Sequence, residues 1–363
     1  MALKIWVSTP FFYPDMSRPW SEVLDDMLSI VDAAEDLGFE GVAINENHFQ
    51  NYVTNPSAIT FATLAAARTE RIQILPGIVP LPNYHPLLLA SQMSLHDHVA
   101  NGRAGIGVAR GGARFQFDRI GVAPQDVRGI YEESLEIIRR AWVEDDMSFD
   151  GKYFAFPRTT LVPKPITKPH PGLWVAAQSV EGVTRVAEQG LNLVTAANYG
   201  NFEPFGDLDK IIAVYDEAVK KTGNPRGEVM VYRHTWLGHT EEEATRYFDN
   251  VVSEYNHYLA AVGGAKKTQD ERLTTRGVGE DTMIVRAGCV EPATETPSRD
   301  NLFEKYSDPV LTTPDRMIER FKSLEQMGVD HVTCLMATGM PGREVVKNME
   351  LMAKEVLPAF ADN

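Results

Sequence analysis

The sequence predicts an α/β fold, a (β/α)8 TIM barrel with insertions after its fourth and seventh strands. Short apolar runs alternate eight times with longer amphipathic stretches along the chain. Near-continuous hydrophobicity in short runs is typical of parallel strands that are buried on both faces. Eight such units with right-handed connections close naturally into a barrel. The same pattern leaves a doubly wound open sheet as the alternative.

The runs expected to form strands are short and bounded by polar or glycine-containing segments. They are residues 3–9, 41–46, 72–79, 103–109, 173–178, 191–197, 228–237 and 331–337. The amphipathic stretches between them predict helices, two of which start near residues 55 and 85. The other expected helices cover residues 21–37, 126–143, 181–189, 207–222, 241–261, 313–327 and 342–357.

Several helix ends carry capping signals. The first helix is expected to begin at Ser21 and to end against Gly38, a residue type common after helix C-termini. Asn55 before Pro56 predicts a cap followed by proline at the first helical position, and His85-Pro86 opens the third helix in the same way.

Two segments interrupt the alternation of strands and helices. Residues 147–171 predict a small hairpin and a proline-rich return loop, and residues 263–312 form a long polar insertion. Long insertions in compact folds are usually functional lids or disordered segments. We therefore expect one domain over residues 1–363, with a mobile lid at 263–312.

Composition excludes several functional classes. The 363 residues carry a formal net charge of −15, which argues against a nucleic-acid partner. No apolar run is long enough to span a membrane, and the N-terminus lacks the pattern of a signal peptide. Cys289 and Cys334 lie far apart, so neither a disulfide nor a cysteine-rich metal site is expected. We expect a cytoplasmic protein.

The ends of the fourth and fifth predicted strands could bind a phosphate. Arg110 precedes Gly111. The guanidinium could bind a phosphate through two hydrogen bonds, and the glycine would let the backbone approach the phosphate closely. Ser179 precedes a helix, and its hydroxyl could join the first helical N–H groups in an anion site. Those N–H groups belong to Val180, Glu181 and Gly182. The alternative is a surface ion pair for Arg110 and a plain helix cap for Ser179.

His48 and His234 are the candidate proton carriers, because imidazole titrates near neutral pH. Each ends a predicted strand, and Asn47 precedes His48. Neither histidine belongs to a recognisable metal-binding pattern. The alternative is a hydrogen-bonded structural histidine. His96, in the third helix, is expected at the surface or at an interface.

Five aromatic residues could line an apolar substrate pocket, with core packing as the alternative. They are Phe11, Phe12, Tyr84, Tyr199 and Trp236.

Several of these segments resemble the luciferase-like monooxygenase family. The similarity is carried by ENHF at 46–49, by residues 74–103 and 105–122, and by MELMAKEVLPAF at 349–360. The resemblance implies FMN at the strand C-termini, with its phosphate on Arg110, Ser179 and the backbone around Gly182.

The family resemblance also places the flavin ring near Gly77 and Ile78, where family members often have a non-prolyl cis peptide. Ala109 and Gln178, at neighbouring strand ends, belong to the same predicted cofactor site. His234 stands where alkanesulfonate monooxygenases also carry a histidine. Bacterial luciferase has two histidines after the strand-2 glutamate and a cysteine on strand 4. This chain has Asn47 in place of the first histidine and Ala109 in place of the cysteine, so a light-emitting role is not expected.

The resemblance implies a two-component monooxygenase. Reduced FMN, supplied by a separate NAD(P)H:flavin reductase, would react with O2 to form a flavin C4a-(hydro)peroxide that oxygenates a small organic substrate. Asn47, His48 and His234 would bind the peroxide or move protons, and the lid would exclude water. The alternatives are an F420-dependent hydride-transfer dehydrogenase and a non-catalytic flavin-binding protein. A homodimer or a higher homo-oligomer is expected, and the helices at 56–68 and 86–100 are apolar enough to form its interface.

Overall fold

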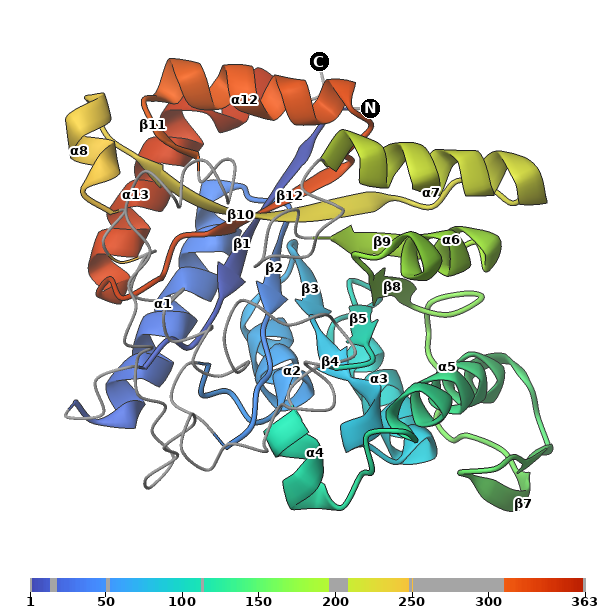
Figure 1. Cartoon of the computed structure of the whole chain (residues 1–363). Coiled ribbons are helices and arrows are strands. Elements are labelled where there is room, and N and C mark those ends of the chain that lie inside the picture. The colour runs from blue at the N-terminus through green and yellow to red at the C-terminus, as the bar shows by residue number, and fades with distance from the viewer. Residues whose placement is uncertain are drawn as a thin grey trace.

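The computed structural model of the protein describes residues 2–13, 18–49, 53–111, 114–195, 208–247, 250 and 310–361. Within this part of the chain, ten strands form one sheet in which every pairing is parallel. The strands are β1 (Lys4–Thr9), β2 (Gly41–Ile44), β3 (Gln73–Pro76), β4 (Val79–Pro80), β5 (Gly105–Ala109), β8 (Gly172–Ala176), β9 (Asn192–Thr195), β10 (Val229–Leu237), β11 (Val310–Thr312) and β12 (His331–Leu335). Their order is β3-β2-β1-β12-β10-β9-β8-β5-β4, with β11 beside β10 (Figure 1).

The sheet curls until its two ends almost meet. Ile74 of β3 forms a parallel bridge with Ala104, just before β5, and its N–H donates to the carbonyl of Arg103 at 3.0 Å. This closure confirms the predicted barrel and excludes the open sheet. The eight predicted strands are all present, but the third is divided into β3 and β4.

The division of the third strand lies at a cis peptide bond between Gly77 and Ile78. Before it, β3 pairs with β2, and after it, β4 pairs with β5. Gly107 of β5 leaves room for this segment: a Cβ atom there would lie 3.0 Å from Ile78 Cδ1 and 3.2 Å from Gly77 Cα.

Helices cover the outside of the barrel (Figure 1). They are α1 (Trp20–Leu37), α2 (Ala58–Arg68), α3 (Pro86–Val99), α4 (Arg114–Ile120), α5 (Val127–Val143), α6 (Val180–Glu188), α7 (Leu208–Thr222), α8 (Glu241–Thr245), α12 (Pro314–Gln326) and α13 (Gly342–Glu355), with 3-10 turns η1 (Leu81–Asn83) and η2 (Leu357–Phe360). The short helix α4 was not expected. Of the helix predicted at 241–261, α8 is the first part, and most of the remainder lies outside the described residues.

Two predicted helix starts are wrong by a few residues. Helix α1 begins at Trp20, one residue before Ser21. Helix α2 is capped by Ser57, whose hydroxyl accepts from the Thr60 N–H at 3.3 Å, and not by Asn55. The Asn55 side chain is engaged elsewhere: it donates to the Asn45 carbonyl at 2.9 Å and accepts from the Ser57 N–H at 3.2 Å. The C-cap Gly38, with φ of 86°, and the start of α3 at Pro86 agree with the sequence.

The segment at 147–171 contains the expected hairpin, β6 (Met147–Asp150) and antiparallel β7 (Ala155–Thr159). Glu133 of α5 holds the hairpin turn. Its carboxylate accepts from three successive backbone N–H groups, those of Lys152, Tyr153 and Phe154, at 2.8, 3.0 and 3.0 Å. Of the predicted lid at 263–312, only residues 310–312 are described, and they form β11.

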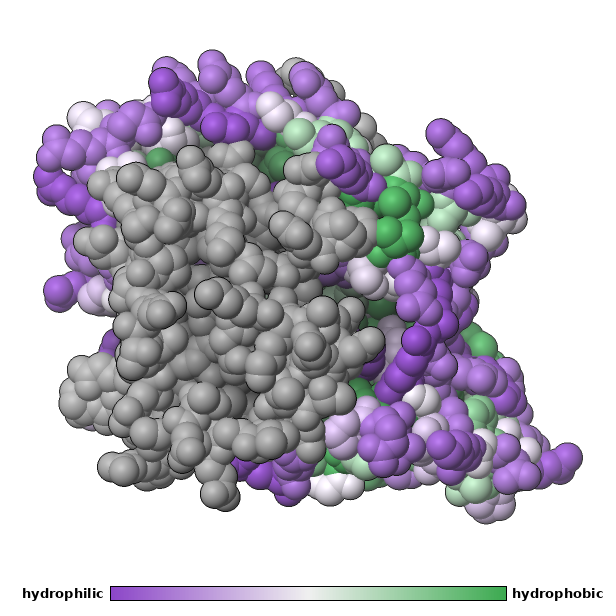
Figure 2. Space-filling model, in the orientation of Figure 1, coloured by the Kyte–Doolittle hydropathy of each residue, from purple (hydrophilic) through white to green (hydrophobic). Residues whose placement is uncertain are grey.

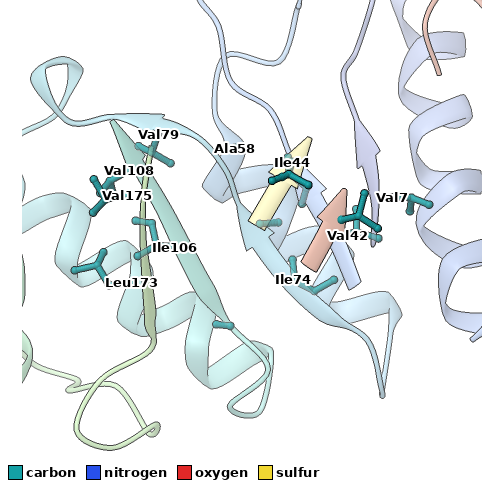
Figure 3. Packing of buried hydrophobic residues seen from close by; sticks show 14 of the residues in the cluster. Val7, Val42, Ile44, Ala58, Ile74, Val79, Ile106, Val108, Leu173 and Val175 are labelled. Atoms are coloured by element: carbon teal, nitrogen blue, oxygen red, sulfur yellow. The ribbon is translucent and has the colours of Figure 1, made fainter. Parts of the chain in front are cut away.

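Two apolar layers stabilise the barrel. Outward-facing strand residues pack against the helices, and Figure 3 shows this layer with Val42, Ile74 and Val108 among its members. The barrel interior is filled by a separate cluster made of Trp6, Ala43, Leu75, Trp174, Val194, Met230, Tyr232 and Leu335. Each fully buried large apolar side chain contributes roughly 1.5–3 kcal/mol. On the face shown in Figure 2, the described helices present mainly hydrophilic residues. None of the described helices is long and apolar enough to cross a membrane.

A polar network lies among the first residues of the barrel strands, at their N-terminal end. The Trp6 indole N–H donates to His331 Nδ1 at 2.9 Å, and His331 Nε2 lies 3.3 Å from Glu228 Oε1. Lys4 Nζ is 3.4 Å from the same carboxylate oxygen. The His331 ring stabilises the carboxylate, and Lys4 adds to this effect against the opposing cost of burial, so the pKa of Glu228 is lowered to about 2.

Candidate functional site

Most of the described residues that the sequence singled out lie at or just beyond the carboxyl ends of the barrel strands, and Phe11 and Phe12 follow β1 in this way. His234 and Trp236 lie within β10, Tyr84 follows η1, and His96 lies in α3. Because all of the barrel strands are parallel, these ends meet at one face of the barrel. Tyr199 lies outside the described residues. Within the described part of the chain, no group of three or more His, Cys, Asp or Glu side chains is arranged to hold a metal ion.

The N-terminus of α6 has the geometry of an anion site. Ser179 caps the helix, and its hydroxyl accepts from the Gly182 N–H at 3.1 Å. A Cβ atom on Gly182 would lie 3.1 Å from that hydroxyl oxygen and 3.3 Å from Ala177 Cβ, so only glycine fits here without displacing its neighbours. The N–H groups of the first turn have no partner within a helix, and the helix dipole favours negative charge there.

Arg110 directly follows β5, and β5 pairs with β8, the strand that precedes α6. Its positive charge is a minor contribution to the lowered pKa of Glu181, whose main cause is a hydrogen bond from Arg128. The strand pairing therefore brings the Arg110 backbone beside the segment that leads into the first turn of α6. Gly111, which follows Arg110, has φ of 73° and is packed so that a Cβ atom would meet the ring of Phe117 at 3.0 Å.

The Glu181 side chain belongs to a network of ion pairs at the surface, so its negative charge is compensated by arginines. Its carboxylate accepts from Arg128 at 2.7 Å and from Arg185 at 3.2 Å. The contact with Arg128 joins α5 to α6, and the contact with Arg185 lies within α6. Only the backbone N–H of Glu181 therefore suits the predicted phosphate site. Gln178, which lies between β8 and α6, and Ala109, the last residue of β5, are both partly exposed.

The segment around Gly77 is held on two sides. Its N–H donates to the Ile44 carbonyl at 2.8 Å, and its carbonyl accepts from the Tyr232 hydroxyl at 3.5 Å. Tyr232 is buried, which raises the pKa of its phenol. Ile78 packs against the interior cluster that contains Tyr232. The backbone segment near which the flavin ring is predicted to lie is therefore held in place by side chains of the barrel interior.

A buried carboxylate lies beside the candidate proton carrier His48. Glu46 Oε1 is 3.0 Å from His48 Nε2, and Glu46 Oε2 accepts from the Ala58 N–H at 2.9 Å. Burial, and then the negative charge of the nearby Glu46, raise the pKa of Tyr84. Tyr84 is thus coupled electrostatically to Glu46, a role that its aromatic character did not predict.

Asn47 has a partner that the sequence did not indicate. The Gln116 amide N–H donates to Asn47 Oδ1 at 2.5 Å, and Gln116 is itself buried. Gln116 belongs to α4, the helix that sequence periodicity missed, so no sequence signal pointed to it. With its oxygen engaged, Asn47 presents its amide N–H groups as donors.

His234 lies on the same face of β10 as the residues that fill the barrel interior. Met230 and Tyr232 of this strand belong to the interior cluster, and alternate residues of a strand face the same side. Trp236 has the same phase, and its ring stacks on Tyr247 with centroids 4.5 Å apart. That contact packs Trp236 against the segment after α8.

The remaining aromatic candidates pack within the fold. Phe11 is fully buried and meets Phe61 edge to face, with ring centroids 4.7 Å apart. Phe12 forms an isolated bridge and a small apolar cluster with Val53. Both contacts correspond to the core packing that the sequence left as the alternative.

The surface expectation for His96 is wrong: it is fully buried, and burial lowers its pKa to about 4.

Comparison with known proteins places the chain among flavin enzymes. The sequence profile of the family described as luciferase-like monooxygenase matches residues 3–331. The oxygenase component of a flavin-dependent trigonelline monooxygenase from Acinetobacter baylyi is 27% identical over 346 residues, covering 94% of this chain and 91% of that protein. An FMNH2-dependent dimethylsulfone monooxygenase from Pseudomonas putida is 26% identical, covering 75% of this chain and 71% of that protein.

Solved structures share the fold at low sequence identity. The oxygenating constituent of 3,6-diketocamphane monooxygenase from Pseudomonas putida, solved with FMN, has a TM-score of 0.78, 19% identity and full coverage of both chains. An F420-dependent secondary alcohol dehydrogenase has a TM-score of 0.71 and 16% identity, again over the full length of both chains.

Proposed function

The chain belongs to the luciferase-like monooxygenase family and is a flavin-dependent monooxygenase, and we propose that it uses reduced FMN and O2 to oxygenate a small organic substrate. The reduced FMN would come from a separate NAD(P)H:flavin reductase, because the relative from Acinetobacter baylyi is named as an oxygenase component. The protein would act in the cytoplasm.

The observation that carries FMN as the cofactor is the anion site at α6. A phosphate would accept from the first N–H groups of α6 and from the Ser179 hydroxyl, while Arg110 supplies the compensating charge. The flavin ring would then lie on the segment at Gly77 and Ile78, which the interior of the barrel supports. These residues fit a cofactor that combines one planar ring system with a single phosphate group.

When bound, reduced FMN supplies the electrons that activate O2. The residues of this chain have separate tasks around it. Asn47, held by Gln116, offers amide donors, and His48, held by Glu46, offers a nitrogen that exchanges protons. His234 reaches the same face of the barrel from β10. Such preorganised donors stabilise developing negative charge without having to reorganise during the reaction.

The phosphate assignment predicts a selective loss of affinity. Replacing Arg110 by Gln removes a charged partner worth about 1.5–3 kcal/mol, so we expect the Kd for reduced FMN to rise roughly ten- to a hundredfold. Reduced riboflavin, which has no phosphate, should bind the wild-type protein and Arg110→Gln equally well. Anaerobic titration followed by fluorescence measures both constants. An equal loss for riboflavin and FMN would contradict a phosphate contact at Arg110.

The same titration separates the two cofactor candidates. Binding of reduced FMN, followed by reoxidation on rapid mixing with O2, is the expected result. Binding of F420 alone, with no reaction with O2, would overturn the proposal and indicate hydride transfer instead.

A further inference from the structure

Glu46 is a buried carboxyl group whose burial requires an explanation. Its side chain is fully buried just after β2, and two donors meet its two oxygens. These donors are the His48 ring at 3.0 Å and the Ala58 backbone N–H at 2.9 Å. A buried carboxylate is costly unless such partners compensate for the lost water. The arrangement is therefore specific, and its two partners indicate what it does.

One partner anchors Glu46, and the other depends on it. Ala58 is the first residue of α2 and belongs to the packed outer layer of the core. His48 lies on the segment after β2. An ionised carboxylate only accepts hydrogen bonds, so the imidazole nitrogen that faces it carries a proton. In the neutral ring this nitrogen is Nε2, which leaves Nδ1 unprotonated.

We propose that Glu46 is a positioning residue that fixes the orientation and the tautomer of His48, so that Nδ1 is the nitrogen that exchanges protons in the site. This inference rests on the proposed function, in which His48 moves protons. Glu46 touches neither cofactor nor substrate in this scheme and acts only through His48.

A purely structural role for Glu46, as a cap of α2, makes a different prediction. Helix α2 already has a cap, since the Ser57 hydroxyl accepts from the Thr60 N–H. If Glu46 only stabilises α2, its loss should damage the site in the same way whether His48 is present or absent. If it acts through His48, its loss should have no effect once His48 is gone.

A double-mutant cycle distinguishes the two roles. The variants are Glu46→Gln, His48→Gln and the double variant, and the measured quantity is the rate at which O2 reoxidises protein-bound reduced FMN in stopped flow. We expect Glu46→Gln to slow this step roughly ten- to a hundredfold, as loss of groups that orient histidines does. Added to His48→Gln, it should change the rate by less than about twofold, and the Kd for reduced FMN should stay unchanged. Rate losses that multiply in the double variant would overturn the proposal.

Glu35→Gln provides a matched control for stability. The Glu35 carboxylate also accepts from backbone N–H groups, those of Glu70, Arg71 and Ile72 at 3.1, 2.9 and 3.0 Å, in the loop that leads into β3. It has no histidine partner among the hydrogen bonds of the described residues. The control should lower Tm and leave the reoxidation rate unchanged. A rate loss in Glu35→Gln equal to that in Glu46→Gln would assign the effect to stability and overturn the proposal.

A measurement without flavin tests the tautomer directly. The chain has nine histidines, and 15N NMR of histidine-labelled protein at alkaline pH separates protonated from unprotonated ring nitrogens, with His48 assigned by its absence in His48→Gln. We expect one nitrogen of each kind for His48 in the wild-type protein and two averaged signals in Glu46→Gln. Averaged signals in the wild-type protein would overturn the proposal. If reduced FMN does not bind at all, the proposed function fails, whereas this experiment still decides whether Glu46 holds His48.

Discussion

Glu228 shows how a single carboxylate stabilises the end of the barrel opposite the candidate site. It faces His331, which is buried between the rings of Trp6 and Trp174, with ring centroids 5.7 and 5.0 Å away. The interaction lowers the pKa of Glu228 from its ordinary value of 4.5 to about 2. A group whose pKa is lower in the folded protein contributes stability above its unfolded pKa. That contribution is lost as the pH falls from about 4.5 through about 2.

We therefore predict that Glu228→Gln lowers the free energy of unfolding at pH 7 by about 1 kcal/mol, a modest value because the side chain is partly in water. The difference from the wild-type protein should shrink as the pH falls below 4.5, the ordinary pKa of this carboxyl group. Urea unfolding over a series of pH values measures it. Glu40→Gln removes a carboxylate 4.0 Å from the same Lys4 and serves as the control. A difference that grows toward acid pH would contradict the assignment.

At the same scale, residue types predicted some contacts of the candidate site and missed others. Ser179 before a helix predicted its cap, because the hydroxyl and the helical N–H groups are local in sequence. The role of Gln116 could not be predicted, because its partner lies 69 residues away. The influence of Glu46 on Tyr84 could not be predicted either, because Glu46 follows a different strand. Sequence periodicity reports burial, and it does not report which polar side chains meet.

At the scale of elements, the length of the periodic pattern decided what could be predicted. Helix α5 and helix α7 were predicted within one residue, because each presents an apolar face over four or more turns. Helix α4 has seven residues, too few for its period to be distinguished. The third strand was predicted as one run because both halves are apolar, although they pair with different neighbours.

The hairpin β6-β7 yields a prediction at this scale. Glu133→Gln replaces a carboxylate that binds three N–H groups by an amide with one acceptor oxygen. We expect the free energy of local opening of the hairpin to be lower than in the wild-type protein by roughly 1–3 kcal/mol. Hydrogen exchange measured by mass spectrometry should become faster at residues 151–154. Exchange in β1 and β12 should not change, and faster exchange there would show instead that the whole barrel had been destabilised.

For the whole molecule, helices α2 and α3 are the elements through which the sequence predicts association. Helices α2 and α3 contact one another, and they carry Leu64, Leu88 and Leu95, which are 43%, 65% and 56% exposed. Water-exposed leucines on neighbouring helices are typical of a surface that is covered in an assembly. We propose that this surface, formed by the three leucines, is the homodimer interface expected from the sequence.

Leu88→Asp would bury an unpaired charge in such an interface, so we expect it to weaken the dimer by roughly a hundredfold or more. Light scattering after size-exclusion chromatography measures the mass of the assembly. Val162→Asp, at an 81% exposed site on the return loop, should leave that mass unchanged. A wild-type monomer, or a dimer that tolerates Leu88→Asp, would contradict the assignment of this surface.

The divided third strand has a consequence for how this fold can vary in length. Residues 73–76 are in register with β2, and residues 79–80 are in register with β5, so one short segment sets two alignments at once. An inserted or deleted residue anywhere between Gln73 and Pro80 would shift one alignment relative to the other and turn side chains to the wrong face. We therefore expect a residue inserted into a loop that leaves a strand to be tolerated better than a residue inserted into this segment.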